Sequence, residues 1–184
     1  MLELLSGIPQ EGSALGQEDA PVEIRTYEDP QCPACAQFHR AAFPEIVERH
    51  VKSGEVRIVS ETLAFLGPDS VPAGLAALAA GEQDRYWQYM SLFFLNQGQE
   101  NSGYVTDEFL TDLAERTPGL DVGRWNERRD SEELEQKLQN VQDQASEAGI
   151  EGTPTLIVSG PEGERELVGA VPADEVTAAI EEVS

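Results

Sequence analysis

The sequence contains only two cysteines, only two lysines and no long run of apolar residues. Two cysteines three positions apart do not predict a disulfide-stapled domain, because so short a ring restrains the unfolded chain far less than a long one. Without an apolar stretch of about 18 residues, we expect no membrane-spanning helix. The start at 1–5 also lacks the basic residues and long apolar core of a signal peptide. We therefore expect the chain as given to be soluble.

The scarcity of basic residues leaves a strongly acidic chain. Twelve Lys and Arg residues face 35 Asp and Glu residues, so the formal net charge is −23. Such a charge repels nucleic acids and anionic lipids, and we expect neither as a partner. The acidity indicates high solubility, in a salty setting that screens self-repulsion, or else a dedicated basic partner. Its 184 residues, 40% of them hydrophobic, suffice for one domain with a buried core.

Two strands and a helix are predicted in the first third of the chain. Residues 22–27 alternate apolar and polar side chains, which is typical of a strand, and Asp29–Pro30 predicts a turn. Helical spacing runs from Cys32 to about residue 52, and a second strand follows at 56–62. This order implies a parallel strand pair with a right-handed crossover.

The remainder is predicted to be a helical insertion followed by a β-hairpin and a last helix. From Ser70, which we expect to cap a helix, to Gly149 only helical patterns occur. Strands are expected at 155–158 and 166–168, and Pro172 opens the final helix. The predicted α/β order is βαβ, insertion, ββα. The expected boundaries are an irregular lead at 1–20, a core at 21–68 and 150–184, and an insertion at 69–149.

The two cysteines form the motif Cys32-Pro33-Ala34-Cys35 where a strand and turn give way to a helix. The thiolate is the reactive species in disulfide exchange, and a helix N-terminus stabilises it through unpaired N–H groups and a partial positive charge. Cys32 lies nearest that N-terminus, and Cys35 lies one turn further in, where it is more buried. Pro33 suits the first turn because it has no N–H. The placement predicts a redox-active pair with Cys32 as nucleophile.

A structural zinc site and a pair of inert buried thiols are the two other interpretations of the cysteines. A structural zinc site needs four ligands, and His39 and His50 are the only histidines. About 16 Å of helix rise separates these two histidines, so one metal ion cannot use both, and we expect no metal. The second alternative is a pair of inert buried thiols, which the position between strand and helix disfavours.

A second motif, Gly152-Thr153-Pro154-Thr155, precedes the third core strand. With this loop, the lead into the first strand at 15–22 and the active-site segment at 27–39, the chain resembles the DsbA-like branch of the thioredoxin superfamily. The resemblance covers nearly the whole chain from about residue 14. It implies a thioredoxin-like fold with a helical insertion and a cis bond between Thr153 and Pro154.

The resemblance also implies roles. Cys32 would attack, Cys35 would resolve, Pro33 and Ala34 would complete the redox motif, and Thr153 with Pro154 would support the site and offer backbone hydrogen bonds to a substrate. Related enzymes often bury an acid six residues before the first cysteine, but Thr26 is found there. Glu28 and Asp29 are expected in the turn, which leaves the proton acceptor for Cys35 open. Ala34 adds no positive charge, so an intermediate potential is expected, between about −270 and −120 mV.

The family acts on protein thiols outside the cytoplasm. We therefore expect protein thiol substrates, a redox partner that recycles the pair, no cofactor, and a monomer, since residues 1–20 are too short for a dimerisation domain. An extracytoplasmic oxidase, periplasmic or on the cell surface, is the favoured function, made from a precursor whose anchor or signal is absent here. The alternative is a non-catalytic or chaperone-like module that uses the insertion to hold clients.

Overall fold

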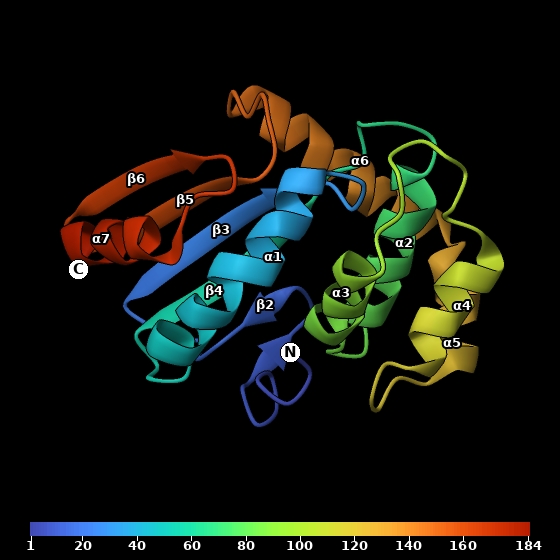
Figure 1. Cartoon of the computed structure of the whole chain (residues 1–184), viewed down its shortest axis with the longest axis horizontal. Helices are drawn as coiled ribbons and strands as arrows, with labels where there is room; N and C mark the ends of the chain where they lie inside the picture. Colours follow the sequence, from blue (N-terminus) through green and yellow to red (C-terminus); the bar gives the residue numbers. More distant parts are fainter.

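A computed structural model describes all residues, 1–184, and its centre is one six-stranded sheet with strand order β1-β2-β4-β3-β5-β6 (Figure 1). Strands β3 (Val22–Glu28) and β4 (Val56–Thr62) pair in parallel, with Val22 opposite Val56 and Glu28 opposite Thr62. This arrangement confirms the predicted crossover and extends the first strand by one residue, to Glu28. The two strand ends therefore meet at one edge of the sheet.

The crossover helix begins directly after the turn at residues 29–32, which ends with Cys32 and which we call the redox turn. Helix α1 (Pro33–Ile46) has Pro33 in its first turn, and the π-helical turn η1 (Val47–Val51) continues it. Its buried side chains lie on one face, which packs on the sheet beside α7 (Ala173–Val183) and against α3 (Tyr86–Leu95). They are Cys35, Ala36, Phe38, His39, Ala42, Phe43 and Ile46. The helix thus carries both cysteines from the edge of the sheet into the core.

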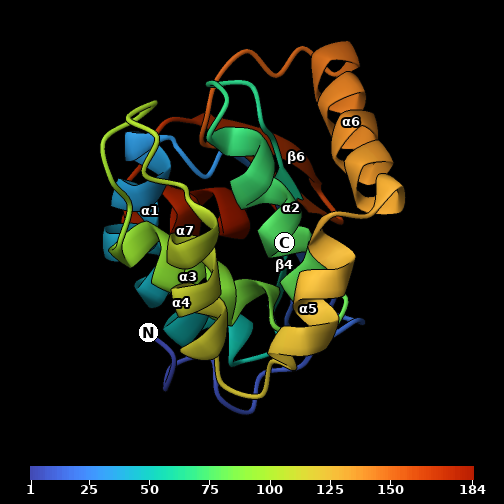
Figure 2. The same ribbon diagram turned by 90° about the vertical axis from the view of Figure 1, so that its right-hand side faces the viewer.

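The insertion consists of five helices between β4 and β5, as predicted. They are α2 (Ser70–Gly81), α3 (Tyr86–Leu95), α4 (Asp107–Glu115), α5 (Val122–Arg129) and α6 (Glu132–Glu147). Figures 1 and 2 show α2 to α5 gathered beside the sheet, with α6 running along one side of this cluster. Helix α2 presents small residues that allow close packing against α3, α5 and α6. No helix is long and apolar enough to cross a membrane.

The chain returns to the sheet after α6. Strand β5 (Thr155–Gly160) pairs antiparallel with β3 and with β6 (Gly163–Val168), which forms the outer edge. Both strands are longer than predicted, and the link between them is the two-residue turn at 161–162. Thr155 lies opposite both Tyr27 and Val168, so the start of β5 reaches the same edge of the sheet as the redox turn.

The lead at 1–20 departs from the expected irregular structure. Two short strands, β1 (Gln10–Glu11) and β2 (Ala14–Leu15), pair with each other, and β2 pairs with β4. The Ser13 carbonyl accepts a hydrogen bond from Trp87 Nε1 at 3.0 Å. These pairings could not be predicted because strands of two residues carry no periodicity, and the β4 partner of β2 lies far away in the sequence.

Candidate active site

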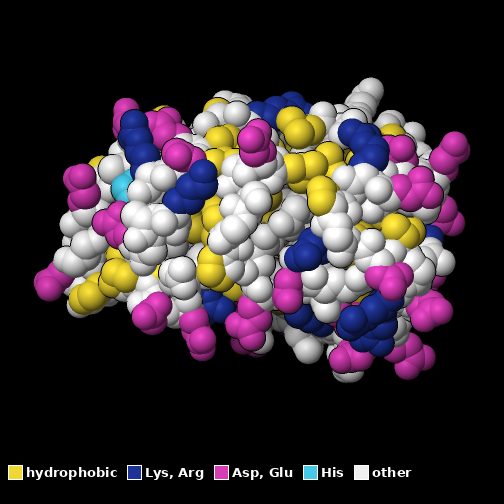
Figure 3. Space-filling view, turned by 90° about the horizontal axis from the view of Figure 1, so that it is seen from below, with side chains coloured by type: hydrophobic (Ala, Val, Ile, Leu, Met, Phe, Trp, Pro, Cys, Tyr) yellow, Lys and Arg dark blue, Asp and Glu magenta, His cyan; other side chains and the backbone are white.

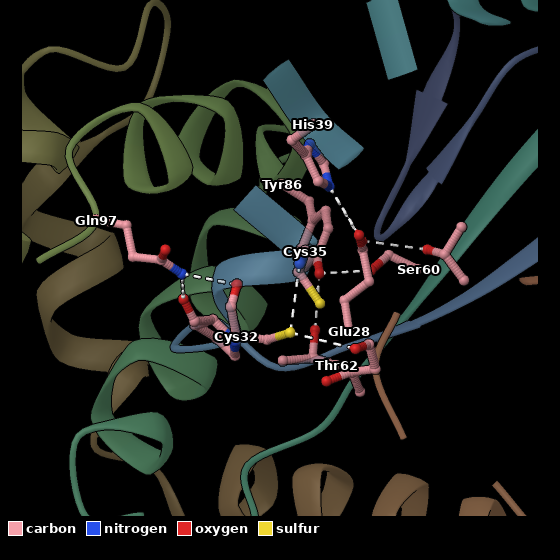
Figure 4. Close-up of polar contacts among 11 residues, drawn as sticks. Glu28, Cys32, Cys35, His39, Ser60, Thr62, Tyr86 and Gln97 are labelled. Atoms are coloured by element: carbon pink, nitrogen blue, oxygen red, sulfur yellow. Dashed lines mark hydrogen bonds and ion pairs between the residues drawn. The ribbon is translucent and has the colours of Figure 1, made fainter. Parts of the chain in front are cut away.

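Cys32 is the N-cap residue of α1. Its backbone is extended, and its Sγ accepts a hydrogen bond from the Cys35 N–H at 3.3 Å (Figure 4). In the thiol form, Sγ donates to the Thr153 carbonyl, also at 3.3 Å. The pKa of Cys32 is lowered to about 6, chiefly by a hydrogen bond from the Cys35 side chain and further by backbone N–H groups of the first turn. At neutral pH the sulfur is therefore largely thiolate.

Both cysteines are buried, but Cys32 is 5% exposed and Cys35 is fully buried. The pKa of the Cys35 thiol is raised well above the ordinary value. Burial is the main cause, followed by the hydrogen bond to Cys32 and the negative charge of Glu28. Both cysteines are free thiols here, so the structure corresponds to the reduced protein. The pair thus holds one reactive thiolate and one protonated, protected thiol.

The other residues predicted for the site surround the pair. Pro33 is exposed and Ala34 is half-buried in the first turn of α1. The Thr153–Pro154 bond is cis, as predicted, and the Thr153 carbonyl contacts the Cys32 sulfur. Pro154 is buried, and its carbonyl accepts a hydrogen bond from Gly169 N at 2.8 Å. The structure thus brings all the residues predicted for the site together.

A buried contact between Glu28 and His39, behind Cys35, corrects one expectation. Glu28 was expected in the turn, but it is the last residue of β3 and only 3% exposed. Its carboxylate lies 3.0 Å from His39 Nε2 and accepts a hydrogen bond from Thr26 Oγ1 at 3.3 Å. His39 packs against the rings of Phe43 and Phe94, at centroid distances of 4.7 and 4.3 Å. This pair places a carboxylate in the buried surroundings of Cys35.

The buried face of the sheet becomes polar at the same edge. Ser60 and Thr62 of β4 lie opposite Thr26 and Glu28, and both hydroxyls contact the Tyr86 hydroxyl, at 2.6 and 2.8 Å. Burial raises the pKa of Tyr86, so its hydroxyl remains protonated. Figure 4 shows this hydroxyl cluster and Glu28 beside the cysteine pair. A polar cluster at the carboxyl ends of parallel strands is where α/β folds commonly place their sites.

Asp29 holds the turn between β3 and α1. The side chain is fully buried, and its Oδ1 accepts from Gln31 N at 2.9 Å and from Ser70 Oγ at 2.7 Å. Its Oδ2 accepts from the backbone N–H groups of Phe65 and Leu66, at 2.9 and 3.1 Å. Ser70 therefore does not cap α2 as predicted; Asp69 takes the N-cap position and Ser70 binds Asp29. One carboxylate thus joins the redox turn to the start of the insertion.

The second histidine lies outside the site. His50 Nδ1 is 2.7 Å from Glu55 Oε2, and His50 Nε2 is 3.0 Å from Thr177 Oγ1. It therefore ties η1 to α7. No group of three or more His, Cys, Asp or Glu residues has a metal-binding arrangement.

The comparisons with known proteins agree with this geometry. A thioredoxin family model matches residues 10–182. The probable disulfide bond formation protein D of Bacillus anthracis is 27% identical over 150 residues, 80% of this chain and 69% of that protein. The disulfide bond formation protein D of Bacillus subtilis is 29% identical over 147 residues, 79% of this chain and 66% of that protein.

A solved structure extends the similarity to the whole fold. Oxidised BdbD from Bacillus subtilis superimposes with a TM-score of 0.83 and 26% identity, covering 95% of this chain and 96% of that one. The DsbA of Chlamydia trachomatis gives a TM-score of 0.81 at 25% identity, covering 92% of this chain and 90% of that one. The chain therefore belongs to the thioredoxin family, in which it is a DsbA-like protein-disulfide oxidoreductase with the CxxC pair Cys32–Cys35.

Proposed function

We propose that the protein oxidises thiols of protein clients outside the cytoplasm, with Cys32 as the attacked and attacking sulfur and Cys35 as the resolving one. The observation that carries this proposal is the contrast between the two sulfurs. Cys32 Sγ caps α1, accepts a hydrogen bond from the Cys35 N–H and belongs to a residue that is 5% exposed, whereas Cys35 is fully buried. A stabilised thiolate is a good leaving group and favours the reduced form of the enzyme, so the disulfide form is a thiol oxidant.

The chemical steps follow from these positions. A client thiolate attacks Sγ of Cys32 in the disulfide form, a mixed disulfide forms, and Cys35 leaves as a thiolate that takes up a proton. A second client thiolate then attacks the client sulfur of the mixed disulfide, and Cys32 leaves as the stabilised thiolate. The client gains a disulfide, and the enzyme gains two electrons. A separate redox partner must accept these electrons to restore the Cys32–Cys35 disulfide.

Exposed apolar side chains support a protein client. The large apolar residues that remain exposed are Phe65, Val71, Leu95 and Val168. The Phe65 N–H binds Asp29, Val71 follows Ser70, and Val168 lies opposite Thr155, next to Pro154. Each of these three therefore belongs to a segment that borders the redox turn or the cis-proline loop. Apolar side chains around an exchange site suit unfolded clients, which expose their own apolar residues.

The acidity supports solubility more than a dedicated basic partner. On the face shown in Figure 3, carboxylates are spread around the rim and do not gather in a single patch. The cysteine content supports the proposed location outside the cytoplasm. Both cysteines of the chain belong to the motif, so an oxidising compartment finds no further thiol in it to pair. We also propose a monomer, since the segment at 10–15 is already paired in the sheet.

Trapping of clients tests the proposal. Cys35→Ser removes the resolving thiol, so its Cys32 can be loaded beforehand as a mixed disulfide with 5-thio-2-nitrobenzoate. A thiol of a reduced, unfolded model client should then displace thionitrobenzoate and leave an enzyme–client mixed disulfide, visible as a heavier species on a non-reducing gel. Cys32→Ser should accumulate none. The wild-type disulfide form should also restore activity to reduced, unfolded ribonuclease. Mixed disulfides on Cys35 in place of Cys32 would contradict the roles assigned to the two sulfurs.

A further inference from the structure

The segment between α3 and α4, residues 96–103, lies against the redox turn; we call it the strap. Gln97 of the strap donates through its side-chain Nε2 to the Pro30 carbonyl at 2.7 Å and to the Cys32 carbonyl at 3.0 Å. Figure 4 shows the Gln97 amide reaching the turn from the helical insertion. One amide group therefore binds the carbonyls of Pro30 and Cys32, the residues before and after Gln31, and Cys32 is the proposed nucleophile.

A second amide pair fixes the other end of the strap. Asn101 N donates to Gln31 Oε1 at 2.7 Å, and Gln31 Nε2 donates back to Asn101 Oδ1 at 3.1 Å. Asn101 also donates through Nδ2 to the Leu66 carbonyl at 2.8 Å, and it adopts a positive φ of 55°. A Cβ at Gly67 would lie only 2.0 Å from Asn101 Oδ1, so a glycine is needed there. The strap is thus fitted to the turn at two points.

The Gln97 contacts affect the position of the Cys32 sulfur, because one of them is made to the Cys32 backbone. The Cys32 carbonyl also accepts the Ala36 N–H at 3.2 Å, which closes the first turn of α1. The sulfur meets the Cys35 N–H and the Thr153 carbonyl at 3.3 Å each, so a small rotation of the Cys32 backbone would disturb both contacts. An N–H donor on the Cys32 carbonyl resists that rotation, and its dipole polarises the peptide group at the start of α1.

We propose that Gln97 is a positioning residue for thiol–disulfide exchange, holding the turn at Pro30–Cys32 so that the Cys32 sulfur faces the first turn of α1 and is favoured as thiolate. This inference rests on the proposed role of Cys32 as the nucleophile. It assigns to the helical insertion a part in setting the redox chemistry. The contribution comes from a residue 65 positions away in the sequence.

Three variants separate hydrogen bonding from charge and from folding. Gln97→Met keeps the length of the side chain but removes both donors. Gln97→Glu also removes them and turns oxygen atoms and a negative charge toward the two carbonyls. The matched control is Gln99→Glu, which adds the same charge to the strap at an exposed side chain that hydrogen-bonds to nothing in the protein. All are compared with the wild type as full chains.

The readouts are the thiolate absorbance at 240 nm against pH and the equilibrium of the pair with glutathione. We expect Gln97→Met to raise the proton affinity of the Cys32 thiolate about threefold and Gln97→Glu about tenfold, the effect of one nearby charge. At pH 8 the tenfold change in Gln97→Glu makes the reduction potential of the cysteine pair about 30 mV more negative, because a less stabilised Cys32 thiolate favours the disulfide form. Gln99→Glu should match the wild type.

Three outcomes would overturn the inference. Unchanged titrations in both Gln97 variants, whatever their melting temperatures, would make Gln97 a purely structural contact. Equal shifts in Gln97→Glu and Gln99→Glu would assign the effect to long-range charge. A lower pKa of Cys32 in Gln97→Met would show that Gln97 disfavours the thiolate, which is the opposite of the inference. If Gln97→Glu fails to fold, Gln97→Met decides alone. The titrations need no client, so a failure of client trapping would refute the proposed function separately.

Discussion

The lowered pKa of Cys32 predicts that the reduced protein gains stability as the pH rises from 5 to 8. A thiol with an ordinary pKa of 9.0 in the unfolded chain has a pKa of about 6 in the folded one. Because the folded value is the lower, the stabilisation is complete above about pH 9 and is lost as the pH falls toward 6. Cys32→Ser removes this dependence, while its hydroxyl can still cap α1.

The magnitude follows from the two pKa values. At pH 8, linkage gives about 2.7 kcal/mol from Cys32, and at pH 5 it gives almost nothing. Solvent near the active site screens part of the interaction, so about 2 kcal/mol is a realistic expectation. For a chain of this size, such a change corresponds to a difference of about 4–8 °C in melting temperature.

The assay compares thermal unfolding of the reduced wild type and of reduced Cys32→Ser at pH 5 and pH 8. The stability of the wild type relative to the variant should rise by about 2 kcal/mol between the two pH values. Absorbance at 240 nm should show thiolate forming with a midpoint near pH 6 in the wild type only. A midpoint near 9, with a stability difference that does not depend on pH, would refute the electrostatic account of Cys32.

Three further predictions follow from buried contacts. Asp29→Ala should lower the free energy of unfolding by about 3 kcal/mol or more in urea titrations, because four donors lose their acceptor. Glu28→Gln should lower the pKa of Cys35, measured by alkylation rate against pH in the Cys32→Ser background, because a negative charge is removed; an unchanged rate profile would contradict the assigned cause. Gly160→Ala should lower the melting temperature, since its Cβ would lie 2.3 Å from the Val183 carbonyl, whereas Gly152→Ala should not.

The parts of the structure that could be predicted from sequence depend on local signals. Alternation at 22–28, helical spacing after Cys32 and the second strand at 56–62 are each contained in one continuous segment. Thr106, Asp121 and Ser131 precede helical patterns, and each accepts the N–H group three residues on, as N-cap residues do. The position of the cysteines at the start of a helix could also be predicted from a local signal, the turn at 29–30 followed by helical spacing.

Glu28 shows where a local signal was available and missed. In β3 the buried residues alternate from Val22 through Ile24 and Thr26, and Glu28 is the next residue on that face. Period-two alternation therefore predicts that its carboxylate is buried. Its partner His39 could not be predicted, because the pairing depends on how α1 crosses the sheet. A buried acid near the redox pair is thus present, but two residues later in the strand than the resemblance implied.

The residues that hold the redox turn come from both parts of the fold, and this explains why they could not be predicted from the motif. Asp29 binds the segment that enters the insertion, and Gln97 and Asn101 bind from the segment between α3 and α4, 65 to 70 residues away. Each is a polar side chain in a loop, where the sequence has no periodicity. The insertion therefore supports the redox turn directly: without it, the turn that carries Cys32 would lose most of its side-chain hydrogen bonds.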